Sequence, residues 1–181
     1  VPAPVPASVR RGIGHFVSSI LTALGVMFGP GHTEVMMTPD GPRLIETHTR
    51  LGGDHIPELV RLTTGVDLHD LWARQVLGES VLPLVPELSA DDAERFAAIR
   101  YAVPEVQGIL TEVGSLDEAR SGAGVSEVSM DISLGAELSG VRHSFTRVAH
   151  AIATGPTAEA AISAAETALK ALKLHVVCGA A

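Results

Sequence analysis

The stretch HTEVMMTPDGPRLIETHTR, residues 32–50, decides how the first part of the chain folds. Two runs in which apolar and polar residues alternate flank the tripeptide Pro39-Asp40-Gly41. Proline presets the first dihedral angle of a turn, aspartate tolerates the bend, and glycine takes a positive φ without steric cost. The pattern therefore predicts a β-hairpin with a three-residue loop, in which Thr38 pairs with Pro42.

Two glutamates face each other in this predicted hairpin. Counting outward from the loop gives the cross-strand pairs Met36–Leu44, Glu34–Glu46 and His32–His48. Directly opposite residues project from the same side of a sheet, roughly 5 Å apart. Two ionised carboxylates at that spacing repel, and a divalent cation between them removes the repulsion; carboxylate oxygens suit Mg²⁺. We therefore predict that Glu34 and Glu46 bind one Mg²⁺ or Mn²⁺ ion. The alternative is that both glutamates are solvated on an exposed face of the sheet.

The residues that follow the second run add a cation and a loop of small residues. Arg50 lies at even spacing beyond Glu46 and His48, so a continuing strand would place it on their side. The next residues are Leu51-Gly52-Gly53-Asp54, where little side-chain bulk lets a ligand approach the backbone. Carboxylates, a metal ion and an arginine beside a Gly-Gly loop indicate phosphate chemistry.

This set of residues resembles the metal-binding half of ATP-grasp ligases, in particular the carboxylate–amine ligases that include bacterial L-amino-acid (dipeptide) ligases. The family pattern is an acidic residue on one strand, a D-G-P turn, and E-x-N-x-R on the next strand. Here these are Glu34, residues 40–42, and the ETHTR run of residues 46–50. His48 replaces the usual asparagine and is a softer, nitrogen donor. The resemblance in this part extends from Gly31 to Gly78.

The resemblance implies an ATP-dependent ligase that forms a C–N bond. The complete enzyme would activate a carboxylate as an acyl phosphate with ATP, and an amine would then attack. It implies Glu34, Glu46 and His48 as ligands of Mg²⁺ (or Mn²⁺), Arg50 as the catalytic residue that holds the transferred phosphoryl group, and Gly52, Gly53, Asp54 and Arg142 as substrate-binding residues. Arg142 is the least specific of these, because an arginine on a surface turn explains it equally well.

The chain departs from the family in its extent. The resemblance covers only about the last half of a family member and leaves out the lobe that carries the ATP-cradling lysines and the adenine pocket. We therefore expect a fragment or one piece of a split enzyme, which alone hydrolyses no ATP. The implied partners are small-molecule carboxylate and amine substrates and a missing N-terminal lobe or second chain, with a homodimer left open. The alternative function is a non-catalytic, stand-alone module that binds a partner or a metal.

Composition excludes several other classes of protein. The chain has 181 residues, 46% of them hydrophobic and only 3% aromatic, which predicts a packed, aliphatic and alanine-rich core. The net charge of −8 argues against a nucleic-acid surface, which needs basic residues. The single cysteine, Cys178, fits a reducing cytosol, so we expect a cytoplasmic location. No apolar run approaches the roughly 20 residues of a membrane span. H-E-x-x-H and G-x-S-x-G motifs are both missing from the sequence, so neither a zinc protease nor a serine hydrolase is indicated.

The order of the predicted elements gives an α+β fold with a small antiparallel β-sheet domain backed by helices. The resemblance implies that the part before this domain is the C-terminal lobe of an ATP-grasp fold. We expect the ATP-grasp part over residues 1–80, a connector over 81–93 and the second domain over 94–181. The first part should hold a helix from Ala7, the hairpin, and two further helices, with Trp72 in the core. The second part should hold strands over residues 96–103, 106–113, 125–134, 147–154 and 174–177, with helices capped by Ser115 and Thr157.

Overall fold

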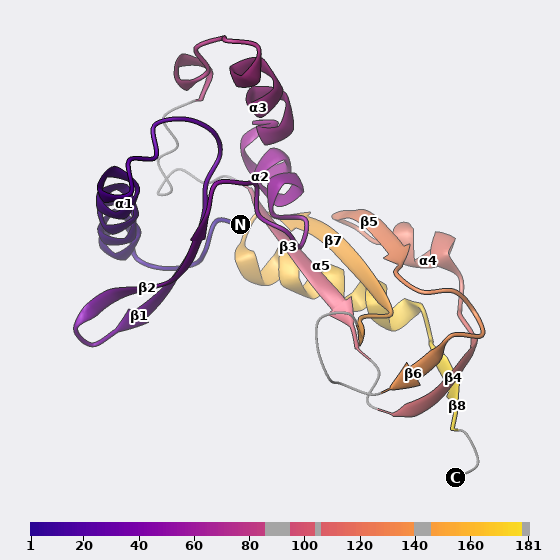
Figure 1. Cartoon of the computed structure of the whole chain (residues 1–181). Coiled ribbons are helices and arrows are strands. Elements are labelled where there is room, and N and C mark those ends of the chain that lie inside the picture. Colours follow the sequence, from indigo (N-terminus) through magenta and orange to yellow (C-terminus); the bar gives the residue numbers. More distant parts are fainter. Residues whose placement is uncertain (86–94, 104–105, 140–145, 179–181) are drawn as a thin grey trace. The chain divides into compact units, whose positions relative to one another are not determined.

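The computed structural model describes residues 1–85, 95–103, 106–139 and 146–178 (Figure 1). The chain divides into two compact units, one over residues 2–93 and one over residues 94–181 together with Val1. The predicted domain boundaries, with a connector over residues 81–93, stay a prediction because most of the connector lies outside the described residues. Membrane-spanning helices are absent from the described part, since none of its helices has the required length and hydrophobicity.

The first unit is a β-hairpin with helices before and after it. It contains helix α1 (Ala7–Ala23), strands β1 (His32–Thr38) and β2 (Gly41–His48), helices α2 (Ile56–Thr64) and α3 (Leu68–Val76), and the 3₁₀ helix η1 (Leu82–Leu84). Helix α2 carries Pro57 in its first turn and ends at Gly65, whose φ of +75° is left-handed. The carboxylate of Asp67 caps α3 by accepting hydrogen bonds from two backbone N–H groups of its first turn. Local capping by these residues accounts for the end of α2 and the start of α3.

The core of the first unit is small. Leu59 and Val81 are buried, with 6% and 8% of their surface exposed. Trp72 is 40% exposed, so the prediction that it lies in the core is wrong. Helix α3 has little more than two turns and packs against α2, and that contact leaves part of the indole ring uncovered. The prediction relied on the general tendency of tryptophan to be buried, which overestimated how much of this unit's surface is covered.

In its described residues, the second unit is built from two small antiparallel sheets and two helices. Its elements are strands β3 (Phe96–Ala102) and β4 (Gln107–Glu112), helix α4 (Leu116–Arg120), strands β5 (Val125–Met130), β6 (Glu137–Ser139) and β7 (Ala149–Gly155), helix α5 (Ala158–Ala171) and strand β8 (His175–Val177). The sheet orders are β3-β7-β5 and β6-β4-β8. Helix α5 lies along β7 and β3 (Figure 1). The predicted antiparallel, helix-backed fold is confirmed, with the strands divided between two sheets.

An alanine-rich interface forms the core of this unit. The central strand β7 is buried along most of its length, and α5 presents alanines to it. The buried cluster consists of Ala119, Val128, Ala149, Ala151, Ala153, Ala165, Ala168 and Leu172. Methyl side chains let a helix and a strand approach closely, and few aromatic rings are needed to fill the space between them. The aliphatic core predicted from composition is therefore confirmed.

Two features of the second unit differ from the predictions. Strand β5 ends at Met130 and does not continue to Leu134, which is 61% exposed. Gly135, with a φ of +85°, turns the chain there and leads into β6, a short strand that was not predicted. The predicted N-caps are confirmed, because the hydroxyls of Ser115 and Thr157 each accept a hydrogen bond from the N–H three residues later.

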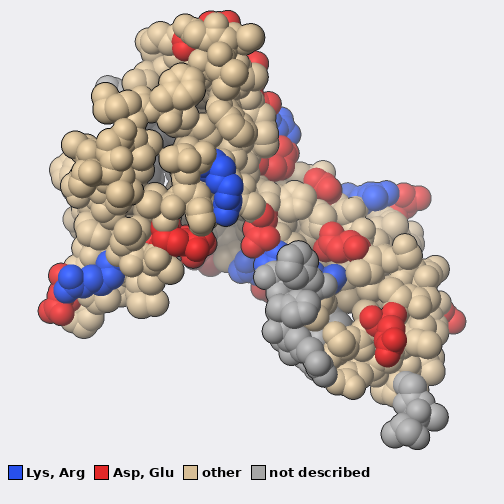
Figure 2. Space-filling model, in the orientation of Figure 1, with Lys and Arg blue, Asp and Glu red and all other residues tan. Residues whose placement is uncertain are grey.

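Charged side chains are scattered over the face of the molecule shown in Figure 2. Figure 2 shows that, on the face in view, Lys and Arg side chains are few and lie apart among larger uncharged areas. This agrees with the net charge of −8.

Candidate metal centre on the hairpin

The hairpin loop is tighter than predicted. Thr38 pairs with Gly41, whose φ is +102°. The Thr38 hydroxyl donates a hydrogen bond to the carbonyl of Gly41 at 2.8 Å and accepts one from the N–H of Asp40 at 3.3 Å. The left-handed glycine is as predicted, but the register next to the loop is shifted by one residue. The observed pairs there are Met37–Pro42 and Met36–Arg43, so the predicted pairs Thr38–Pro42 and Met36–Leu44 are wrong.

A β-bulge restores the predicted register farther from the loop. Val35 pairs with Leu44 and the next residue, Glu34, pairs with Glu46, so Ile45 is an extra residue in β2. The pairs Glu34–Glu46 and His32–His48 are therefore both present in the structure. Because opposite residues share a side of the ladder, four potential metal ligands project from one side of the hairpin.

Three of these side chains converge. His32, Glu34 and Glu46 each offer one ligand atom, and the three atoms lie within 4.8 Å of one another. Nε2 of His32 is 3.4 Å from Oε1 of Glu34. The imidazole of His32 is 17% exposed, whereas the carboxylates of Glu34 and Glu46 are 52% and 46% exposed. The cluster therefore has one well-anchored nitrogen donor and two carboxylates that solvent can reach.

His48 flanks this cluster. Its Nε2 lies 3.2 Å from Oε1 of Glu46, and its side chain is 41% exposed. His48 was predicted as a ligand, and His32 was predicted only as its cross-strand partner. The signal for His32 was present, because a residue two positions before Glu34 on a strand points to the same side.

The Gly-Gly loop packs against the histidine of the cluster. A Cβ atom on Gly52 would lie 3.0 Å from Nδ1 of His32 and 3.0 Å from Cδ1 of Ile56. Gly53 differs, since a Cβ there would meet nothing within 4 Å. The Nδ1 edge of the imidazole thus faces Gly52, while its Nε2 faces Glu34. Gly52 therefore has a packing reason to be glycine. This reason was not predicted from the sequence, from which Gly52 was expected only to line a substrate pocket.

The backbone after this loop adopts a rare conformation. Asp54 and His55 have φ angles of +52° and +60°, two consecutive left-handed residues that are not glycine. Asp and His are among the residues that tolerate this region, although it costs free energy. Helix α2 follows at once, and the N–H of Ile56 donates to the carbonyl of Gly53 at 3.0 Å. Sparsely populated backbone of this kind concentrates at ligand-binding sites, which keeps Asp54 a candidate.

Arg50 does not lie on the strand that was expected to carry it. Strand β2 ends at His48, and Arg50 is an exposed residue in the bend that follows. Its Nη1 donates a hydrogen bond to the carbonyl of Leu51 at 2.9 Å. Strand alternation therefore places only Glu46 and His48 on a common side. Arg142, the other predicted arginine, lies outside the described residues.

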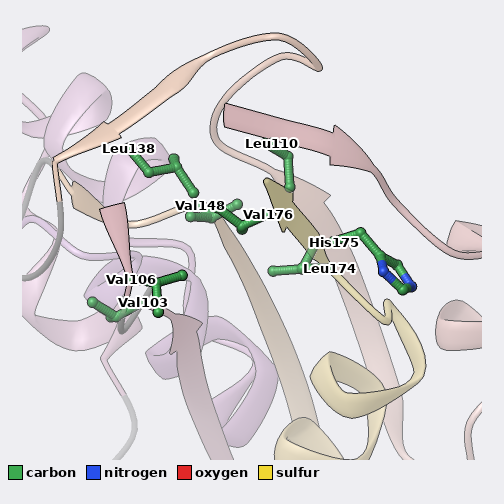
Figure 3. A pocket seen from close by; sticks show the side chains of 8 residues that line it. All are labelled: Val103, Val106, Leu110, Leu138, Val148, Leu174, His175 and Val176. Atoms are coloured by element: carbon green, nitrogen blue, oxygen red, sulfur yellow. The ribbon is translucent and has the colours of Figure 1, made fainter. Parts of the chain in front are cut away.

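The second unit contains a hollow whose lining differs from the cluster on the hairpin. It measures about 430 Å³ and is lined by Val103, Val106, Leu110, Leu138, Val148, Leu174, His175 and Val176. Figure 3 shows aliphatic side chains gathered around it, with the imidazole of His175 at one side. A lining without carboxylates offers no counterpart of the His–Glu–Glu cluster, so the hairpin is the stronger candidate for chemistry.

Comparison with known proteins places this geometry in context. Residues 100–177 match the family described as L-amino acid ligase C-terminal domain 2. The chain resembles the C-terminal half of ATP-grasp ligases. The resemblance that the sequence predicted is thereby confirmed, and the ligase-like fold covers both units of the chain.

Individual proteins resemble the chain over nearly its whole length. The uncharacterized protein y4rH of Sinorhizobium fredii is 27% identical over 171 residues, which are 94% of this chain and 34% of that protein. The crystal structure of an L-amino acid ligase from Bacillus licheniformis has a TM-score of 0.78 at 22% identity, over 99% of this chain and 43% of the ligase. Phosphoribosylglycinamide synthetase from Anaerococcus prevotii has a TM-score of 0.81 at 19% identity, over 98% of this chain and 44% of that enzyme. The chain thus spans between a third and a half of the length of these three proteins.

Proposed function

We propose that this chain is the metal-binding, C-terminal portion of an ATP-dependent carboxylate–amine ligase that works through an acyl phosphate. The observation that carries the proposal is the convergence of His32, Glu34 and Glu46 on one side of the hairpin, in a chain with a ligase-like fold. ATP-grasp ligases use ATP together with magnesium, a general property of the family. The roles of individual residues given below are parts of the proposal.

The donor set on the hairpin fits a divalent cation. Three ligand atoms lie within 4.8 Å of one another, and two of them are carboxylate oxygens, the ligands that Mg²⁺ and Mn²⁺ prefer. Glu34 and Glu46 would hold the ion, with His32 and His48 beside them. A cation held by these residues would supply positive charge to offset the negative charge that develops during phosphoryl transfer.

Arg50 would bind the phosphoryl group. A guanidinium has five N–H donors in a planar fork, which suits phosphate oxygens better than an ammonium group does. The carbonyl of Leu51 uses one Nη1 donor and holds the side chain at the end of the hairpin, and the remaining donors can contact phosphate. Gly53 and Asp54, where the backbone is open, would line the substrate pocket, and Gly52 would support His32. Arg142 stays a candidate substrate ligand.

The rest of the catalytic site would come from outside these residues. The chain spans 43% of the L-amino acid ligase that it resembles. We propose that the ATP-cradling lysines and the adenine pocket belong to an additional lobe or a second chain, and that the reacting partners are a small carboxylate and an amine, in the cytoplasm. On this basis the 181-residue chain by itself hydrolyses no ATP.

The test is phosphate release from ATP by the protein assembled with its ATP-binding lobe, in the presence of a panel of amino acids. Glu46→Gln should lower turnover by on the order of 10²–10³, the usual effect of losing one preorganised electrostatic contact. Asp40→Asn is the matched control, because Asp40 is an 83%-exposed carboxylate at the tip of the same hairpin. Unchanged turnover in Glu46→Gln would refute the proposed role. Metal binding without any amino-acid-dependent phosphate release would favour the alternative, a non-catalytic metal-binding module.

A further inference from the structure

The hairpin carries two histidines where a magnesium site would need only oxygen ligands. Each carboxylate of the facing pair has an imidazole beside it: His32 is 3.4 Å from Glu34, and His48 is 3.2 Å from Glu46. The two histidines are themselves a cross-strand pair, two residues farther from the loop on each strand than the two glutamates. The result is a patch of two imidazoles and two carboxylates on one side of a single hairpin.

Nitrogen donors change which cation such a patch prefers. Mg²⁺ is small and hard, demands octahedral oxygen coordination and gives up its water reluctantly. Imidazole nitrogen suits first-row transition ions, and mixed histidine–carboxylate sets bind Zn²⁺ and Fe²⁺ in some catalytic sites. Two carboxylates balance the charge of one divalent cation, and neutral imidazoles add ligands without adding charge.

We propose that this site prefers divalent first-row transition cations to Mg²⁺, with His32 as a nitrogen ligand. The inference rests on the proposed function, because it concerns the same metal site. His32 is the histidine that the structure assigns most directly: one of its ring nitrogens can reach the point on which Glu34 and Glu46 converge. His48 extends the donor set from the opposite strand.

The fold holds the His32 imidazole in the required orientation. Its side chain is 17% exposed, so it is far less free than the glutamates. The backbone at Gly52 lies against its Nδ1 edge, at a distance that leaves little room even for a methyl group. That contact turns Nε2 toward Glu34 and away from the loop. A ligand whose ring is fixed before binding loses less entropy when the ion arrives.

The experiment measures binding to the 181-residue chain and needs no catalysis. Co²⁺ is the probe, because its visible absorption changes when nitrogen enters its coordination sphere, and Mg²⁺ is titrated in parallel by calorimetry. Co²⁺ should bind at least tenfold more tightly than Mg²⁺. His32→Gln should weaken Co²⁺ binding at least tenfold, change the visible spectrum, and leave Mg²⁺ affinity within about twofold. His69→Gln, in a 71%-exposed histidine of the same unit, is the matched control and should change neither.

The outcomes separate this inference from the proposed function. If Glu46→Gln abolishes binding of both ions while His32→Gln and His48→Gln leave the Co²⁺ spectrum unchanged, the nitrogen-ligand inference fails and the carboxylate site stands. Equal or tighter binding of Mg²⁺ by the wild-type chain also overturns the inference. If neither ion binds, the metal site fails altogether. Gly52→Ala supplies an independent check, because it should disturb His32 and reduce Co²⁺ affinity while both carboxylates remain in place.

Discussion

Replacing Glu46 by glutamine should raise the stability of the metal-free protein and lower that of the metal-bound protein. The carboxylates of Glu34 and Glu46 have oxygens within 4.8 Å and are each about half exposed, so the dielectric constant of water applies. Two charges at that distance repel by about 0.9 kcal/mol. Salt at a physiological concentration reduces this to about 0.5 kcal/mol, and neighbouring imidazoles reduce it further. Without metal, Glu46→Gln should therefore melt up to about 4 °C above the wild type, for a unit of this size.

Added metal should reverse the order of the two melting temperatures, so that the wild type melts above Glu46→Gln. At a Mn²⁺ concentration about 100 times its dissociation constant, binding stabilises the native state by about 2.7 kcal/mol. For a unit of this size that corresponds to a rise of about 10 °C or more in melting temperature. Glu46→Gln lacks one of the two charged ligands and should show only a small part of that rise. The variant that is more stable without metal thus becomes the less stable one with metal.

The assay is thermal unfolding followed by tryptophan fluorescence, with and without Mn²⁺. Trp72 is the single tryptophan of the chain and lies in the same unit as the hairpin, so its emission reports on the unit that binds the ion. Asp40→Asn removes a charge from the same hairpin and should respond to Mn²⁺ as the wild type does. A metal-free Glu46→Gln protein that melts below the wild type, or one that gains the full Mn²⁺ effect, would refute the reasoning.

Three further predictions concern the stability of the two units. Leu110→Ala removes a side chain with 0% exposure and should lower the free energy of unfolding, measured with urea, by about 2–5 kcal/mol. A loss below about 1 kcal/mol would contradict this and show that the hollow beside Leu110 collapses to fill the space. Gly124→Ala should destabilise the protein more than Gly135→Ala. Both glycines have a positive φ, but a Cβ at Gly124 would lie 2.5 Å from a carbonyl oxygen of β7, whereas one at Gly135 meets nothing within 4 Å. Equal losses of stability would contradict this steric argument. Hydrogen bonds from Arg61 lower the pKa of Glu58 below 4.5, so this pair adds stability above that pH that is lost as the pH falls through the lower, folded-state pKa. Glu58→Gln should therefore flatten the decline of the melting temperature in acid, and an unchanged decline would count against the pair.

Features whose causes lie within a few residues could be predicted from the sequence. Ser115 and Thr157 were predicted as helix caps from the sequence, and each accepts a hydrogen bond from the N–H three residues later. Features decided by distant packing could not be predicted in this way. The exposure of Trp72 depends on what covers α3, and the end of β5 at Met130 depends on how its partner strand β7 begins. Neither feature can be predicted from the local pattern of apolar residues.

The candidate site combines both kinds of feature. The pairing of Glu34 with Glu46 was predicted from an unbroken ladder and a three-residue loop. The structure has a tighter register at the loop and one extra residue, Ile45, in the second strand. The two deviations cancel, so the predicted pair is present although the path assumed between the loop and the pair is wrong. Strand alternation places His32 on the side of Glu34, but its contact with Gly52, which orients the imidazole ring, cannot be predicted from that alternation.

The bulge at Ile45 is the feature on which the site depends. In the register set by the Thr38–Gly41 pair, an unbroken ladder would place Glu34 opposite Ile45, and Glu46 would point to the other side of the hairpin. One carboxylate would then be separated from the other by the sheet, and no single ion could reach both. Inserting one residue into β2 after the turn moves Glu46 and His48 together onto the side of Glu34 and His32. Bulges often direct a side chain into a functional site in this way. Ile45 itself is 54% exposed and contributes little to a core, so its value to the protein lies in the register that it creates for its neighbours.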